Sequence, residues 1–131
     1  MIFVDSNIPM YLIGAEHPNK AAARRGLEDA IADGAVLCTD AEVLQEILHR
    51  FVAIRRPDDI DPAFDVLLGV VDVVYPIEEA DVRRARRILR RVERLSARDA
   101  VHLAIMQRHD VDEVLSFDAA FDGLPGVRRR A

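Results

Sequence analysis

Residues 1–7 of the chain read MIFVDSN, and the order of residue types in this stretch indicates the fold class. Its apolar run IFV (2–4) is short and contains β-branched residues, which is typical of a strand buried on both faces. An acid, Asp5, follows the run directly. Residues 113–118, EVLSFD, repeat the pattern and end on Asp118. Because open parallel sheets bind their ligands at the carboxyl ends of strands, the two acids predict a shared site at one sheet edge.

The rest of the chain alternates short apolar runs with longer amphipathic segments. Besides IFV and EVLSF (113–117), strands are expected at AVLC (35–38), VVY (73–75) and Gly126–Arg129. Helices are expected at residues 18–33, 40–54, 62–69, 79–95 and 97–109. The first of these is predicted to stop at Gly34, and the fourth to bury a stripe of Val82, Ala85, Leu89 and Val92. Strands that alternate with helices predict an α/β fold with a parallel sheet covered on both faces.

Length and composition suit one globular domain that spans residues 1–131. No apolar run approaches the roughly 20 residues of a membrane helix, and the first residues lack the basic start of a signal peptide. Cys38 is the single cysteine and is expected to be a buried, reduced thiol. These features predict a cytoplasmic protein without a membrane segment. The net charge of −5 argues against a protein that coats nucleic acid by charge alone.

The carboxylates each have a structural interpretation beside the functional one. Asp5 and Asp118 could simply cap the helices that follow them. Asp99 lies in SARD (96–99), which resembles a capping box, but it also continues the apolar stripe of Leu103 and Met106. A carboxylate beside apolar surface is costly unless a partner or a cation compensates it. That cost favours a functional role for Asp99.

Three further features stay open at the level of the sequence. Glu46 shares a helix flank with Glu42 and Arg50, and a surface ion pair with Arg50 would explain it as well as a functional role. His102 follows Asp99 by one turn, but a packed or surface histidine is the favoured interpretation. The arginines 83, 87, 90 and 94 form a stripe that is either a solvated face or a contact for an RNA backbone.

Four segments together resemble the PIN-domain ribonucleases, and more narrowly the VapC toxins of bacterial toxin–antitoxin pairs. They are FVDSN at Asp5, AEVLQEILHRF at Glu46, LSARDAVHLAIM at Asp99 and VLSFDAAFDGLPGV at Asp118. The segments span nearly the whole chain. Their order and spacing make the combination more specific than any one of them.

The resemblance implies a central parallel sheet of four or five strands flanked by helices, and a metal-dependent endoribonuclease that cleaves RNA phosphodiester bonds. It assigns the catalytic acids to Asp5, Glu46, Asp99 and Asp118. Of these, Asp5, Asp99 and Asp118 would hold Mg²⁺ or Mn²⁺, while Asn7, Ser116 and Asp122 would support the site. An all-oxygen site of this kind disfavours zinc. The resemblance also implies a cognate VapB-type antitoxin and a homodimer.

Two alternatives keep the same fold. One is a non-catalytic PIN-fold module that binds a partner protein, and the other is a house-keeping RNA-processing nuclease. A phosphate-signalling receiver domain is disfavoured because such domains use a lysine near the last strand, whereas the single lysine here is Lys20, in the first long helix.

Overall fold

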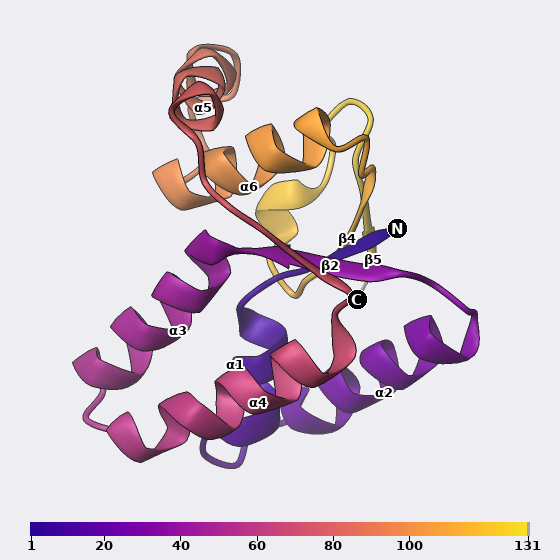
Figure 1. Cartoon of the computed structure of the whole chain (residues 1–131), viewed down its shortest axis with the longest axis vertical. Helices are drawn as coiled ribbons and strands as arrows, with labels where there is room; N and C mark the ends of the chain where they lie inside the picture. Colours follow the sequence, from indigo (N-terminus) through magenta and orange to yellow (C-terminus); the bar gives the residue numbers. More distant parts are fainter. Residues whose placement is uncertain (131) are drawn as a thin grey trace.

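The computed structural model describes residues 1–130 and places a five-stranded parallel sheet between two layers of helices (Figure 1). The strands are β1 (Ile2–Val4), β2 (Leu37–Asp40), β3 (Val73–Tyr75), β4 (Glu113–Leu115) and β5 (Arg128–Arg130). The helices are α1 (Asn7–Ile13), α2 (Asn19–Ala32), α3 (Ala41–Ala53), α4 (Ile60–Val70), α5 (Glu79–Arg91) and α6 (Ala97–Arg108). Two short 3-10 turns, η1 (Pro57–Asp59) and η2 (Ala119–Phe121), complete the elements.

The strand order is β3-β2-β1-β4-β5, so the sheet has its switch point between β1 and β4. The chain first builds outward from β1 to β3 and then returns to the other side of β1. Figure 1 shows α1 to α4 on one face of the sheet and α5 and α6 on the other. The central strands are buried on both faces, and Phe3, Val4, Val114 and Leu115 are fully covered. This order brings the carboxyl ends of β1 and β4 side by side.

The structure confirms the predicted α/β class and shifts some boundaries. The second strand was expected at 35–38 but lies at Leu37–Asp40. Residues just before it close helix α2 instead: Gly34 has φ of +75°, and the Ala35 amide donates to the Ala30 carbonyl. A left-handed glycine after a helix is a common C-terminal cap. Because Gly34 and Ala35 belong to this cap, the strand begins only at Leu37.

Helix boundaries differ where local signals were ambiguous. Helix α4 begins at Ile60, so Pro62 lies inside its first turn, where a missing amide hydrogen breaks no helical bond. Helix α5 ends at Arg91 and not near Leu95, and Val82, expected in its buried stripe, is 52% exposed. The short helix α1 was not expected as an element. None of the helices within residues 1–130 combines the length and apolarity needed to cross a membrane.

Helix α5 is fastened to α6 by one ion pair as well as by apolar packing. Asp81, buried in the first turn of α5, accepts two hydrogen bonds from Arg108 of α6, at 2.7 Å from Nε and 2.9 Å from Nη2. The Glu78 amide donates to the same carboxylate at 2.8 Å. Burial alone would raise the pKa of Asp81, but the Arg108 and Glu78 hydrogen bonds outweigh it and lower the pKa. The pair therefore stabilises the fold above the usual pKa of an aspartate, and this contribution is lost as the pH falls.

Replacing Asp81→Asn should lower the free energy of unfolding by about 1–3 kcal/mol, because it weakens charge-assisted hydrogen bonds to a buried group. Urea unfolding at neutral pH measures the loss, which should shrink in acid. The matched control is Glu79→Gln, which breaks an exposed pair with Arg83 and should cost less than about 0.5 kcal/mol. Equal losses in the two variants would contradict the assignment.

Candidate active site

Asp5 lies at the carboxyl end of β1 with its carboxylate held from two sides. The Ser6 amide donates to Oδ1 at 2.8 Å, and the Ser116 hydroxyl donates to Oδ2 at 2.6 Å. The Asn7 amide group adds a longer contact to Oδ2 at 3.4 Å. The residue is 3% exposed. Asp5 does not cap α1, whose N-cap is Ser6, so the simple capping interpretation fails for this acid.

Asn7 and Ser116 link Asp5 to the loop after β4. The Asn7 side chain donates to the Ser116 hydroxyl at 3.1 Å and accepts from the Phe117 amide at 3.3 Å. The same hydroxyl accepts from the Asp118 amide at 3.0 Å. Ser116 is fully buried, so its hydroxyl acts as an internal bridge. Both residues therefore brace the strand end that carries Asp5 and the loop that carries Asp118.

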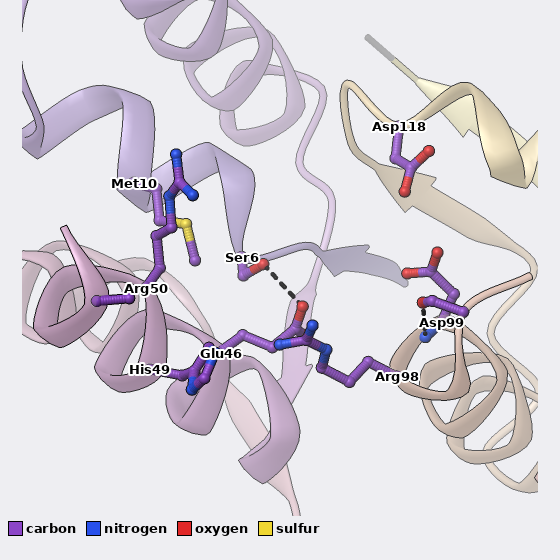
Figure 2. A pocket seen from close by; sticks show the side chains of 10 residues that line it. Ser6, Met10, Glu46, His49, Arg50, Arg98, Asp99 and Asp118 are labelled. Carbon is purple, nitrogen blue, oxygen red and sulfur yellow. Dashed lines mark hydrogen bonds between the residues drawn. The ribbon is translucent and has the colours of Figure 1, made fainter.

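Asp118 and Asp99 reach the same opening from different elements. Asp118 does cap the turn η2, because its Oδ1 accepts from the Ala120 amide at 2.9 Å, yet the residue also lines the pocket. Asp99 lies in the first turn of α6, where its amide donates to the Ser96 hydroxyl at 3.1 Å. In Figure 2 both carboxylates face the opening. Asp118 therefore both caps a turn and lines the pocket, whereas the cap of α6 is Ser96 and Asp99 lines the pocket without capping the helix.

The pocket itself is open and mixed in charge. It is lined by Ser6, Met10, Glu46, His49, Arg50, Ala53, Ser96, Arg98, Asp99 and Asp118. Asp5 lies beneath it, close enough to Asp99 to influence its charge. Acids from β1, α3, α6 and the loop after β4 therefore converge on one place.

The electrostatics of this cluster are unfavourable in the absence of a cation. Burial, followed by repulsion from Asp5 and Asp118, raises the pKa of Asp99 to about 6. Burial also raises the pKa of Asp5, although His102 and Ser116 partly oppose it. Carboxylate oxygens that repel one another in an open pocket are the ligands that hard divalent cations prefer. The residues present therefore fit a divalent metal ion.

Glu46 enters the pocket from α3 instead of pairing along its own helix. Its Oε2 accepts from the Ser6 hydroxyl at 3.4 Å, and its Oε1 contacts Nε2 of His102. Within residues 1–130 no ion pair joins it to Arg50. Glu42, which the sequence could not rank below Glu46, does not line the pocket; burial, then repulsion from Glu46, raises its pKa.

His102 lies at the centre of the contacts beneath the pocket. It is packed and fully buried, as expected, but it also lies at the site, between Asp40 and Glu46. Its Nε2 is 3.9 Å from the Asp5 carboxylate. Burial lowers the pKa of His102, but the hydrogen bonds to Asp40 and Glu46 outweigh it and raise the pKa well above its usual value.

One imidazole nitrogen thus lies among the oxygens. Asp5, Glu46 and His102 each offer one possible ligand atom, and these atoms lie within 4.8 Å of one another. Both ring nitrogens already contact carboxylates, those of Asp40 and Glu46, so the expectation that zinc is disfavoured stays a prediction. Asp40 was also missed. It is the last residue of β2, and the strand predicted at residues 35–38 ended before it.

Asp122 lies outside the pocket lining and is paired with Arg129, at 2.8 Å from Nε and 3.0 Å from Nη2. Arg129 also donates to the Ser116 carbonyl at 3.2 Å, so the pair braces the loop that carries Asp118. In the arginine stripe, Arg83 pairs with Glu79, and Arg94 donates to backbone carbonyls of the loop that carries Asp122. Residues Arg128–Arg130 form β5, which confirms the strand expected at Gly126–Arg129 with its start two residues later.

Replacing Asp99→Asn should stabilise the metal-free protein at neutral pH. Because the pKa of Asp99 is about 6 in the folded chain against 3.8 normally, the folded state holds this proton more tightly. The stability from that proton is complete below about pH 4 and is lost as the pH rises through about 6. A neutral Asn should remove the loss and raise the free energy of unfolding on the order of 2 kcal/mol.

Urea unfolding in EDTA, on either side of that pH window, measures the effect. Asp65→Asn, an exposed change on α4, is the matched control and should keep the wild-type pH dependence. An Asp99→Asn variant with the same pH dependence as wild type would refute the repulsion.

Comparisons with known proteins agree with this geometry. The family model described as PIN domain matches residues 2–127. Ribonuclease VapC13 of Mycobacterium tuberculosis is 59% identical over 131 residues, covering 100% of both chains. Ribonuclease VapC23 of the same species is 39% identical over 118 residues, covering 90% of this chain and 93% of the relative.

Two solved structures share the fold. The crystal structure of Mycobacterium tuberculosis VapC20, described as a sarcin-ricin loop cleaving toxin, has a TM-score of 0.76 at 24% identity and covers 98% of this chain and 99% of its own. The Rickettsia felis VapBC2 structure, bound to a promoter DNA fragment, has a TM-score of 0.74 at 15% identity and covers 99% and 98%. With the matched family model and the full-length relative, the conclusion is direct: this chain belongs to the PIN-domain family and, within it, to the VapC ribonucleases.

Proposed function

We propose that this protein is a metal-dependent endoribonuclease, the VapC toxin of a toxin–antitoxin pair, which hydrolyses RNA phosphodiester bonds. The observation that carries the proposal is the convergence of Asp5, Asp99 and Asp118, with Glu46 beside them, at one open pocket. The full-length similarity to ribonuclease VapC13 supports the choice of RNA as substrate. The same convergence disfavours a non-catalytic module, in which the acids would only cap helices.

Asp5, Asp99 and Asp118 are the residues that would hold the metal, and we propose Mg²⁺ or Mn²⁺ as the ion. Their hard oxygen ligands suit either one. A divalent cation at such a site lowers the pKa of a water molecule and balances charge on phosphate oxygens. The Ser116 hydroxyl and the Asn7 amide keep the Asp5 carboxylate directed at the pocket.

The remaining side chains would work on water and phosphate. The Glu46 carboxylate, held by Ser6 at the pocket wall, is placed to accept a proton from attacking water. Arg98 lies at the rim next to Asp99 and offers a guanidinium group to a phosphate of the RNA. Asp122 would support the reaction indirectly, because its pair with Arg129 steadies the Asp118 loop.

We further propose that residues 1–131 form a single PIN domain that acts in the cytoplasm, forms a homodimer and binds a VapB-type antitoxin. The Rickettsia felis toxin–antitoxin complex has the same toxin fold, which supports such a partner. A basic side chain of the antitoxin could pair with the pocket carboxylates and so block RNA and metal.

Light scattering of the free protein and of its co-expressed complex tests the homodimer and the antitoxin complex. A protein that stays monomeric and gains no partner contradicts both.

Purified, antitoxin-free protein should cut total cellular RNA into discrete fragments when Mg²⁺ or Mn²⁺ is present, and EDTA should stop the reaction. Asp99→Asn and Asp118→Asn should each lower the rate by at least about 100-fold, because they remove charge that the cation needs. Asp65→Asn is the matched control and should cut at the wild-type rate. Cleavage that survives EDTA and Asp99→Asn would refute the site. Intact RNA in every sample would favour the non-catalytic module, and a few ordered cuts in precursor RNA would favour the house-keeping nuclease.

Arg98→Gln should raise KM for an RNA oligonucleotide several-fold and leave kcat nearly unchanged. The reason is that a rim arginine contributes to substrate binding and does not take part in bond cleavage. The KM effect should fall as salt is added, since salt screens phosphate contacts. Arg25→Gln, an exposed change on α2, is the matched control. A kcat loss with constant KM would contradict this role for Arg98.

A further inference from the structure

Asp40 and His102 form a polar chain inside the core, below the pocket. Both side chains are 0% exposed. Asp40 ends β2 and caps α3, since its Oδ1 accepts from the Val43 amide at 2.8 Å. Its other oxygen, Oδ2, lies 2.7 Å from Nδ1 of His102 on α6. One buried carboxylate thus ties a strand end to two helices.

The second ring nitrogen of His102 leads to the site. Nε2 contacts Oε1 of Glu46, whose Oε2 accepts from the Ser6 hydroxyl. The ring also packs against Phe3, with ring centroids 5.3 Å apart. Because both nitrogens and one face of the ring are engaged, His102 cannot turn without breaking a contact.

Burying the polar side chains of Asp40 and His102 in the core costs free energy of folding. The residues that follow His102 on α6, from Leu103 to Met106, are buried and apolar, so a buried histidine at position 102 is a polar exception in this part of the helix. A buried histidine and a buried aspartate lose their hydration, and they persist when every polar atom has a partner. Here the partners are complete, and the chain of contacts ends on an acid that lines the pocket.

We propose that Asp40 and His102 are positioning residues for RNA cleavage, which hold the Glu46 carboxylate at the wall of the pocket. This inference rests on the proposed function. His102 does not line the pocket, so it acts through Glu46 and does not touch RNA. Without this anchor, the Glu46 side chain, which has three rotatable bonds, would sample positions along α3 that point away from Asp5.

The size of the effect follows from comparable supports in other sites. Loss of a group that orients a reacting carboxylate or a metal ligand typically costs about 10- to 100-fold in activity or metal affinity. A small misplacement of a reacting group has consequences of the same order. The effect should appear in kcat, because substrate still reaches an open pocket.

A double-mutant cycle tests the proposal. The first variant is Asp40→Asn with His102→Leu, in which Asn still caps α3 and no buried charge is left unpaired. It should lower kcat about 10- to 100-fold with KM nearly constant. Added to Glu46→Gln, it should cause almost no further loss. The single variant His102→Gln, with Asp40 unchanged, retains a donor for Glu46 and should have most of the wild-type kcat.

Two further measurements separate positioning from simple destabilisation. Ile105→Val removes a buried methyl group from the same helix and should lower stability without changing kcat. Urea unfolding of the same four proteins in EDTA should show that the first variant and Glu46→Gln are coupled, because both remove the contact between His102 and Glu46, and this measurement needs no RNA.

The outcomes are distinguishable. Wild-type protein that cuts no RNA would refute the proposed function, while a non-additive cycle in urea unfolding would still support the link from His102 to Glu46. If the wild type cuts RNA, but the first variant and Glu46→Gln lower kcat and stability independently of each other, the positioning role is wrong and the proposed function still stands. Failure of His102→Gln to retain activity in a folded, stable protein would also overturn the positioning role.

Discussion

Repulsion between carboxylates at one edge of the parallel sheet explains why the surrounding polar contacts are arranged as they are. Asp5, Asp99 and Asp118 come from β1, from α6 and from the loop after β4, and burial adds to the cost of their charge. The fold opposes that repulsion with short polar links, chiefly the Ser116 hydroxyl and the Asn7 amide. The repulsion that remains is a stability defect of the metal-free protein, and under the proposed function a bound cation would relieve it.

The topology explains why the cost arises at this edge. The strand order places β1 next to β4 at the switch point, where helices diverge to opposite faces and open a crevice. A second polar layer lies beneath the pocket, where His102 connects Asp40 to Glu46. The ion pair of Asp81 with Arg108 lies at the other end of α6 and fastens α5 there. Helix α6 thus carries Asp99 at its start, His102 one turn later and a structural anchor at its end.

Much of the fold and part of the site could be predicted from the sequence, because a short apolar run followed by an acid marks the carboxyl end of a buried strand. Asp5 and Asp118 were visible in this way, and Asp99 stood out as a charge on an apolar stripe. Glu46 could not be separated from Glu42, since its partners Ser6 and His102 are 40 and 56 residues away. The Asp40–His102 contact spans 62 residues and leaves no local pattern. A helix cap at Gly34 moved β2 by two residues, and with it the strand end that would have revealed Asp40.

Whether these carboxylates bind a cation together can be measured by calorimetric titration of Mn²⁺ into the metal-free, antitoxin-free protein, in two buffers of different ionisation enthalpy. We predict saturable binding that releases protons near pH 6, because Asp99 still carries part of its proton there. Asp99→Asn should abolish that proton release and weaken binding. Mn²⁺ that fails to bind, or that binds Asp99→Asn as tightly as wild type, would contradict the central claim that these carboxylates form one metal site.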